Sequence, residues 1–242
     1  GFPGIDLKDP RRDALDILQK AMNGLSSDLM TRIRDEQGLV YYTGVLQRPG
    51  LEPGFLALYA GTHTGAVERV QGLMEELLEL ARIDAPQEPE SAERIAVSDI
   101  VAAAVAVVRT KAEERGIAVA VELAPELLVN AAPVAAKDAL ANILDNAVKF
   151  SPIGGQVRVV VTAGPEYAVI AVSDSGPGVS REESPRLFER FYRGNASRAA
   201  DVPGVGLGLA ISQALVERQG GRIAVEAPTE QGATFSIHLP RA

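Results

Sequence analysis

The sequence contains no cysteine and only two histidines. Without cysteine, neither disulfide staples nor thiolate metal sites can form, and this fits the reducing environment of the cytoplasm. The histidines, His63 and His238, stand too far apart in the sequence to suggest a histidine-built metal cluster. We therefore expect a cytoplasmic protein that needs neither disulfides nor a cluster of soft metal ligands.

Positive charge and long apolar runs are also scarce. Lys and Arg number 24 against 32 Asp and Glu, so the formal net charge is −8. A nucleic-acid partner is disfavoured, because its phosphate backbone would be repelled. No apolar run reaches the roughly 20 residues that span a bilayer. The chain starts at Gly1 with neither an initiator Met nor a secretory leader, and we interpret it as a soluble fragment of a longer or tagged protein.

Apolar residues make up 46% of the chain, enough for a real core in one or two domains. Residues 1–10 are rich in Gly and Pro and are predicted to be a linker or tag. Residues 11–85 carry two apolar stripes at helical spacing, interrupted at Arg48-Pro49-Gly50. The first stripe runs through Leu15, Leu18, Met22, Leu25, Leu29 and Ile33, extended by Val40, Val45 and Leu46. The second helix is predicted to begin near Pro53, and its stripe runs through Phe55, Leu58, Thr62, Ala66, Val70, Leu73, Leu77 and Leu80.

These two stripes predict a long antiparallel helical hairpin over residues 11–85. One hairpin cannot bury the stripes of both its helices, so we expect a homodimer that completes a four-helix bundle. The alternative is that the stripes pack on the second domain of the same chain.

The pattern changes after a polar linker at residues 86–94 (PQEPESAER). The domain 95–242 is predicted to be α+β, an α/β sandwich with helices on one face of a mixed sheet. The expected helices are 98–115, 137–150 and 206–219, and the expected strands are 117–123, 156–162, 168–174, 221–227 and 232–239.

The helix 137–150 carries a set of polar residues that share one face. Asn142 and Asn146 are four residues apart, and Lys149 follows three residues later. Carboxamide oxygens are suitable Mg²⁺ ligands, and a lysine is a suitable partner for phosphate oxygens. Taken alone, these residues would more simply form a solvated helix face.

Two glycine-containing segments strengthen the functional interpretation. Asp174 ends a predicted strand and is followed by Ser-Gly-Pro-Gly, where a carboxylate could accept a hydrogen bond from an exocyclic amine. Gly204, Gly206 and Gly208 precede a helix, where backbone N–H groups can bind phosphate. Each segment alone is a weak signal, but their order along the chain is informative.

Taken together, these segments resemble the sensor histidine kinases of two-component systems and the wider ATPase superfamily to which they belong. The resemblance rests on five motifs in order: ALANILDNAVKFSP, DSGPG, LFERFYRG, GVGLGLAIS and GATF. It covers roughly residues 88–240, and MEELLELARID is typical of the end of the family's second dimerisation helix.

The resemblance implies an ATP site with a bound Mg²⁺. Asn146 would hold Mg²⁺ with Asn142 beside it, and Lys149 and Arg193 would contact phosphate. Asp174 would bind the adenine amine. Further residues would shape the adenine pocket or belong to a mobile lid: Gly176, Gly178 and Thr234 in the pocket, and Phe188, Phe191, Gly204, Gly206 and Gly208 in the lid.

The position of Asn142 distinguishes branches of the superfamily. Hydrolytic members have a glutamate four residues before the metal-binding asparagine, where it acts as a general base for water. Asn142 cannot take a proton, so phosphoryl transfer is favoured over hydrolysis.

The phosphoacceptor histidine of the family's active members is missing. One register places Thr31 at its position, a second register places Asn23 there, and no histidine lies in residues 1–62. His63 is predicted to be an ordinary residue of the second helix, flanking its stripe.

Three hypotheses follow. The chain binds Mg-ATP without autophosphorylation, as a regulatory pseudokinase; or it is an active kinase with an unusual acceptor or one that phosphorylates another histidine kinase in trans; or its hairpin is an ATP-biased docking module for a response-regulator receiver domain. The family resemblance also allows the fragment to come from a membrane-bound sensor.

Overall fold

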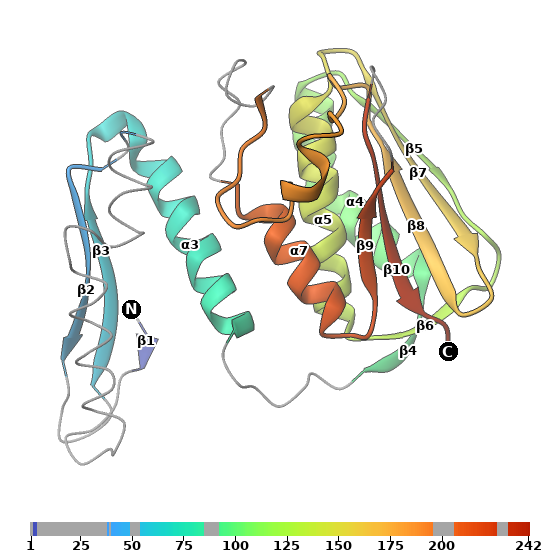
Figure 1. Ribbon diagram of the computed structural model, residues 1–242, viewed down its shortest axis with the longest axis horizontal. Helices are drawn as coiled ribbons and strands as arrows, with labels where there is room; N and C mark the ends of the chain where they lie inside the picture. Colours follow the sequence, from blue (N-terminus) through green and yellow to red (C-terminus); the bar gives the residue numbers. More distant parts are fainter. Residues whose placement is uncertain are drawn as a thin grey trace. The chain divides into compact units, whose positions relative to one another are not determined.

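The computed structural model describes residues 2–3, 38, 40–48, 54–84, 92–195, 206–226 and 232–242. These residues belong to two compact units, Gly1–Glu75 and Glu76–Ala242. In Figure 1 the colours of the first unit run from blue to teal, and those of the second from teal, within α3, to red. None of the helices in the described segments is long and apolar enough for a membrane span.

The C-terminal unit is built on a five-stranded sheet with the order β5-β7-β8-β10-β9. Strand β5 (Ala118–Glu122) runs parallel to β7 (Gln156–Ala163). The remaining pairs are antiparallel and join β7 to β8 (Tyr167–Ser173), β8 to β10 (Thr234–Pro240) and β10 to β9 (Arg222–Val225). The buried residues of β7 alternate with exposed ones, as expected for a sheet with one covered face.

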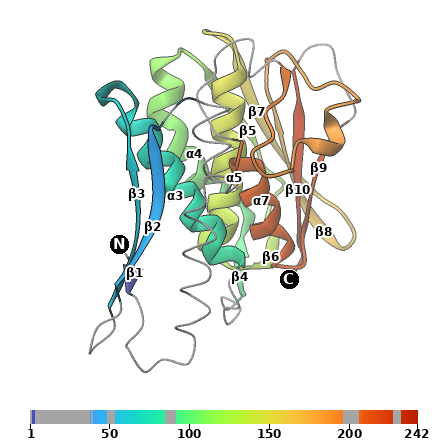
Figure 2. The same ribbon diagram turned by 60° about the vertical axis from the view of Figure 1, so that its left-hand side comes forward.

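Three helices cover one face of this sheet, as Figures 1 and 2 show. They are α4 (Val97–Glu114), α5 (Pro133–Phe150) and α7 (Gly208–Glu217). A small second sheet pairs β4 (Glu93–Ala96) with β6 (Leu128–Ala131) in antiparallel fashion. The unit is therefore an α/β sandwich with its helices on one side.

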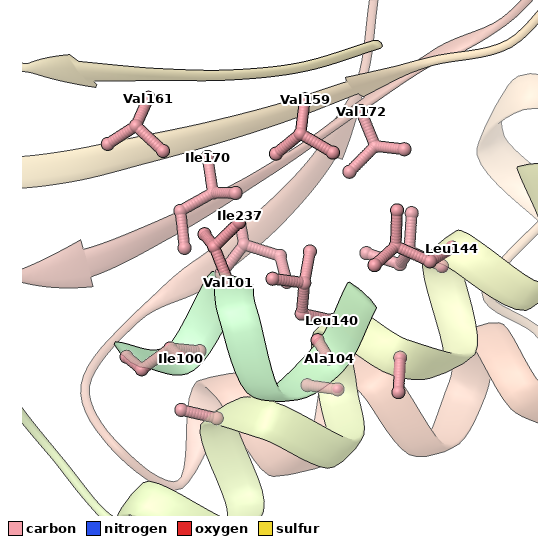
Figure 3. Packing of buried hydrophobic residues seen from close by; sticks show 14 of the residues in the cluster. Ile100, Val101, Ala104, Leu140, Leu144, Val159, Val161, Ile170, Val172 and Ile237 are labelled. Carbon is pink, nitrogen blue, oxygen red and sulfur yellow. The ribbon is translucent and has the colours of Figure 1, made fainter. Parts of the chain in front are cut away.

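The core lies between the helices and the sheet. Figure 3 shows sheet side chains such as Val159 and Ile170 meeting Val101 of α4 and Leu140 of α5. Leu140 and Leu144 are completely buried on α5, and α5 packs against both α4 and α7. Burial of this stripe fixes which side of α5 faces outward, and that outward side carries the polar residues.

The structure confirms the predicted helices and strands of this unit with shifted ends. Gly116 follows α4 with a positive φ of 62°, the left-handed conformation that commonly ends a helix. The helix α5 starts four residues earlier than predicted, because Pro133 occupies its first turn, where proline is favoured. The prediction missed β4 and β6, and β4 begins inside the expected linker.

The N-terminal unit contains a three-stranded sheet with the order β1-β3-β2. It comprises β1 (Phe2–Pro3), β2 (Tyr42–Arg48) and β3 (Phe55–Gly61), all paired antiparallel. A 3₁₀ turn, η2 (Thr64–Ala66), then leads into the helix α3 (Val67–Asp84).

The predicted helical hairpin is wrong for the described part of this unit. Residues 42–48 and 55–61 form strands, although both were expected in helices, and only α3 matches the second predicted helix. The segment FLALYA at residues 55–60 fits either periodicity, and a short apolar run does not distinguish a helix from a strand. Pairing with β2 settles the choice, because every residue of β3 stands opposite a residue of β2 in an antiparallel ladder. The first predicted helix lies mostly outside the described residues.

The two faces of this small sheet differ in burial. Val45 is buried, as are Val70 and Leu73 of α3 in the same unit. On the other face, Tyr42 and Tyr59 are 57% and 45% exposed. Leu46 and Phe55 belong to that exposed face too, because residues opposite each other in an antiparallel pair share a face.

Candidate functional site

The polar residues of α5 lie on its outward side. Asn142, Asn146 and Lys149 are all partly exposed, whereas the intervening Ile143, Leu144, Ala147 and Val148 are buried in the core. The helix therefore presents two carboxamides and one ammonium group along one side, as the spacing predicted. This side is the centre of the candidate site.

Asp145 is a charged member of this surface that the sequence analysis did not select. Its carboxylate forms an ion pair with Lys149 at 2.5 Å and a second ion pair with Lys111 of α4. Burial raises the pKa of the Asp145 carboxyl, but the charges and hydrogen bonds of Lys149 and Lys111 outweigh burial, so its pKa lies below the ordinary value. The i, i+4 spacing to Lys149 is a sequence signal, whereas the approach of Lys111 depends on the packing of α4 on α5.

Asp174 lies directly after β8, with its side chain turned back onto the backbone. Its Oδ1 accepts hydrogen bonds from the Gly176 N–H at 2.7 Å and the Ala233 N–H at 3.2 Å. Burial raises the pKa of the Asp174 carboxyl above its ordinary value, although these two hydrogen bonds act in the opposite direction. The carboxylate is held in one orientation by the loop that follows it and by the last motif of the chain.

Two glycines in these loops allow close approaches of the backbone. A Cβ at Gly176 would lie 3.0 Å from the carbonyl oxygen of Phe150, the last residue of α5. A Cβ at Gly232 would lie only 2.2 Å from the Asp174 carbonyl oxygen, and Gly232 has a positive φ of 77°. The Gly232 N–H donates to the Gly176 carbonyl at 2.7 Å. The motifs DSGPG and GATF thus meet beside the end of α5.

Thr234 is the first residue of β10 and belongs to the same corner. Its Oγ1 lies 2.9 Å from Oγ of Ser173, the residue before Asp174. The predicted grouping of Thr234 with Asp174 and Gly176 is therefore present in the fold. Gly178 lies two residues beyond Gly176 and adopts a positive φ of 79°.

The N-terminal end of α7 lies beside Asn146. A Cβ at Gly208 would be 3.9 Å from the Asn146 Nδ2 atom, and no side chain caps this helix end. Ser212 of α7 donates a hydrogen bond to the Ala139 carbonyl of α5 at 3.1 Å, which holds the two helices together. Unpaired N–H groups in a first helical turn are suitable donors to an anion.

The expected lid residues fall into two groups. The Phe191 N–H donates to the Gly206 carbonyl at 2.9 Å, and a Cβ at Gly206 would collide with the Tyr192 carbonyl oxygen. Phe188 instead packs edge-on against Phe235 of β10, with ring centroids 6.5 Å apart. The motif LFERFYRG therefore contacts both the second glycine motif and the sheet.

Other predicted residues lie apart from this surface or outside the described residues. Gly204, Thr31 and Asn23 fall outside the described residues. Arg193 is partly buried near the end of the lid segment. His63 is exposed in the loop before η2, so its predicted place on a helix is wrong.

His238 lies on β10, as expected, where it contacts the Ser236 hydroxyl at 3.2 Å. Burial and the nearby Arg222 charge lower the pKa of the His238 imidazole below its ordinary value. The described segments contain no cluster of three or more His, Cys, Asp or Glu side chains suited to a metal ion. A hard cation in this site would therefore need the Asn146 carboxamide together with oxygens of a ligand.

The C-terminal half of the chain matches a known ATPase family. Residues 131–242 match the family described as histidine kinase-, DNA gyrase B-, and HSP90-like ATPase. A solved structure of the mycobacterial sensor histidine kinase MprB is 32% identical, with a TM-score of 0.56, over 62% of this chain and 98% of that one. Through its C-terminal unit, the chain belongs to the histidine kinase family of ATPase domains.

Curated relatives support the same assignment. The phosphate regulon sensor protein PhoR of Pseudomonas aeruginosa is 32% identical over 72% of this chain and 39% of PhoR. The histidine-protein kinase/phosphatase MprB of Mycobacterium avium is 37% identical over 72% of this chain and 33% of MprB. Full-length ShkA, solved in complex with AMPPNP, is 29% identical with a TM-score of 0.63, over 72% of this chain and 36% of that one. The chain spans between about a third and two fifths of these curated relatives.

The N-terminal part matches a different family. Residues 1–90 match the family described as peptidase M16 inactive domain. A match to PhoR over 72% of this chain is too long to fit within residues 85–242, so it also includes part of α3. The helix α3 therefore lies in both regions of similarity.

Proposed function

We propose that the C-terminal unit binds Mg-ATP and that the chain does not phosphorylate itself. One observation carries the ATP part of this proposal. Two glycine motifs meet α5: the N-terminal turn of α7, which no side chain caps, lies with Gly208 beside Asn146, and the loop after Asp174 lies with Gly176 at Phe150, the end of the helix. These approaches bring backbone N–H donors and a fixed carboxylate to the helix that carries the carboxamides, which is a set of groups suited to a nucleotide.

In the proposed complex, each end of the nucleotide has its own partners. The fixed Asp174 carboxylate accepts a hydrogen bond from the adenine amine, and Gly176, Gly178 and Thr234 surround the adenine ring. Lys149, Arg193 and the first N–H groups of α7 bind phosphate oxygens. The carboxamide oxygen of Asn146, with Asn142 beside it, would coordinate a Mg²⁺ bound to the phosphates. The bound Mg²⁺ would neutralise phosphate charge.

The polar side of α5 supports phosphoryl transfer over hydrolysis. Asn142 is partly exposed one helical turn before Asn146, and a carboxamide cannot accept a proton from an attacking water. Two carboxylates lie on the described part of this side: Asp145 is engaged by two lysines, and Asp138, one turn before Asn142, is paired with Lys137. Neither carboxylate is arranged as a general base for water.

The features that support the absence of self-phosphorylation lie in the N-terminal part of the chain. Residues 42–48 and 55–61 form strands within the segment expected to be the family's dimerisation hairpin, and residues 1–90 match a different family. No histidine precedes His63. The homodimeric four-helix bundle and a response-regulator receiver domain stay predictions, and in the described residues the strands replace parts of the hairpin from which the bundle was argued.

Two measurements on the full chain test the proposal. Isothermal titration with ATP and Mg²⁺ should show saturable binding, which Asp174→Ala should weaken strongly. Incubation with radiolabelled ATP should leave no acid-labile label on the chain. Absence of ATP binding would end the first part of the proposal, and acid-labile label would end the second.

Transfer in trans is a second candidate, favoured by the position of Asn142. A kinase of this kind would label a histidine of another protein, such as the dimerisation hairpin of another histidine kinase, while leaving the chain itself unlabelled. Adding such a hairpin to the radiolabel assay separates the two candidates. Label that persisted on the chain itself and vanished in His63→Gln would instead identify an unusual acceptor.

A further inference from the structure

Three side chains of alternating charge, Lys111, Asp145 and Lys149, form a cluster where α4 meets α5. Lys149 and Asp145 are one turn apart on α5 and form an ion pair at 2.5 Å. Lys111 reaches the same carboxylate from α4, and each lysine engages a different oxygen, Oδ1 for Lys111 and Oδ2 for Lys149. The carboxylate can therefore lose one lysine and still keep the other.

The surroundings strengthen these electrostatic interactions without isolating them from water. The side chains of Lys149 and Asp145 are 23% and 30% exposed, and Lys111 is more exposed at 42%. The cluster has a net charge of +1 and lies beside Asn146, on the side of α5 where the proposed phosphates would bind.

We propose that Asp145 is a positioning residue that regulates phosphate binding by competing with the nucleotide for Lys149. In the free protein, Asp145 holds Lys149 along α5. When Lys149 turns to a phosphate oxygen, Lys111 remains on the other carboxylate oxygen and limits the repulsion between Asp145 and the phosphates. This inference rests on the proposed function, because it assigns a regulatory pair to the same ATP site.

The proposal predicts opposite effects for the two partners of Lys149. Asp145→Asn releases Lys149 and raises the net charge of the cluster from +1 to +2, so phosphate binding strengthens. Lys111→Gln lowers the net charge to zero and leaves Lys149 as the sole partner of the carboxylate, so phosphate binding weakens. A merely structural role would instead make both variants weaker, through loss of the same α4–α5 contact.

Titration of the full chain with ATP and with adenosine, both in the presence of Mg²⁺, tests this prediction. Because the groups are partly exposed, ATP affinity should rise about two- to fivefold in Asp145→Asn and fall by a similar factor in Lys111→Gln. The double variant should return toward the original affinity. Adenosine, which has no phosphate, should bind all variants equally, and the ATP differences should shrink as salt is raised.

A second ion pair on α5 provides matched controls. Lys137 and Asp138 pair at 2.7 Å near the start of the helix, about three turns from Lys149. Lys137→Gln and Asp138→Asn should leave ATP affinity unchanged. Thermal unfolding of every variant checks its folding, and Asp145→Ser is a second neutral replacement should the Asn variant be unstable.

The outcomes separate this inference from the proposed function. If the unsubstituted chain does not bind ATP, the proposed function fails. If it binds ATP but both variants shift affinity in the same direction, or adenosine shifts as much as ATP, Asp145 does not compete for Lys149. Loss of the Mg²⁺ dependence in Asp145→Asn would make Asp145 a metal ligand instead and would overturn the inference.

Discussion

The two compact units differ in how completely they enclose their apolar surfaces. In the C-terminal unit, three helices cover one face of a five-stranded sheet, and the residues between them are almost wholly buried. In the N-terminal unit, the three-stranded sheet buries Val45 on one face and exposes Tyr42, Leu46, Phe55 and Tyr59 on the other. The C-terminal unit therefore has a closed core, whereas the described residues of the N-terminal sheet expose apolar side chains on one face.

Loss of a core side chain should have the largest effect. Leu144→Ala removes a fully buried side chain from α5 and should lower the free energy of unfolding of the C-terminal unit by about 2–5 kcal/mol. Chemical denaturation measures this loss. Amide hydrogen exchange of the native protein should show faster exchange in the C-terminal unit and unchanged exchange in β2 and β3. Val134→Ala, at a site that is 59% exposed on the same helix, is the control with little change. Equal loss of protection in both units would show that they unfold together.

Removal of the Asp174 carboxylate should have the next largest effect, confined to nucleotide binding. Hydrogen bonds to a charged group contribute about 1.5–3 kcal/mol, so Asp174→Ala should weaken ATP binding by at least about tenfold. The exposed Asp99 of α4 provides the matched control Asp99→Ala. An unchanged ATP affinity in Asp174→Ala, measured by calorimetry, would contradict the proposed adenine contact.

Acid should weaken ATP binding through the same residue. The pKa of Asp174 is raised, so its carboxylate is protonated at a higher pH than an ordinary aspartate. Affinity should therefore fall as the pH is lowered toward this raised pKa, and Asp174→Asn should flatten that dependence.

The effect of pH on folding stability through Asp174 runs in the opposite direction from its effect on ATP affinity. Because its folded pKa exceeds the unfolded value, the contribution is fully present below the unfolded pKa and is lost as pH rises through the folded pKa. Asp145, whose pKa is lowered, contributes stability above its unfolded pKa that is lost as pH falls through the folded one. If the ATP affinity of Asp174→Asn varied with pH as it does in the unsubstituted chain, Asp174 would not be the residue that makes ATP binding sensitive to acid.

The smallest effect is expected on the open face of the N-terminal sheet. Tyr59→Lys replaces a side chain that is 45% exposed, and it should change the free energy of unfolding by about 0.5 kcal/mol or less. Thermal unfolding measures this change. Leu73→Ala on the buried side is the contrasting variant and should be strongly destabilising. A large loss of stability in Tyr59→Lys would mean that this face is covered in solution.

Much of the C-terminal unit could be predicted because its local patterns agree with its tertiary contacts. The stripe through Val101 and Val108 faces the core of α4, and the alternation along β7 and β8 matches their covered face. The missed strands β4 and β6 are only four residues each, too short for a periodic signal. In the candidate site, Asn146 and Asp174 could be selected because their motifs occur in a fixed order. For Asp145 the sequence offered only the spacing to Lys149, since the second partner, Lys111, comes from another helix.

The sequence by itself determined the polar side of α5 and the glycines around it, because helical spacing and glycine content are local properties of the chain. Only the tertiary structure decided that residues 55–61 form a strand and that Lys111 reaches Asp145. Both outcomes depend on partners distant in the sequence, β2 for the strand and α4 for the carboxylate. A local pattern cannot specify such partners, since hydrogen bonds across a sheet and ion pairs between helices form only when the chain brings them together.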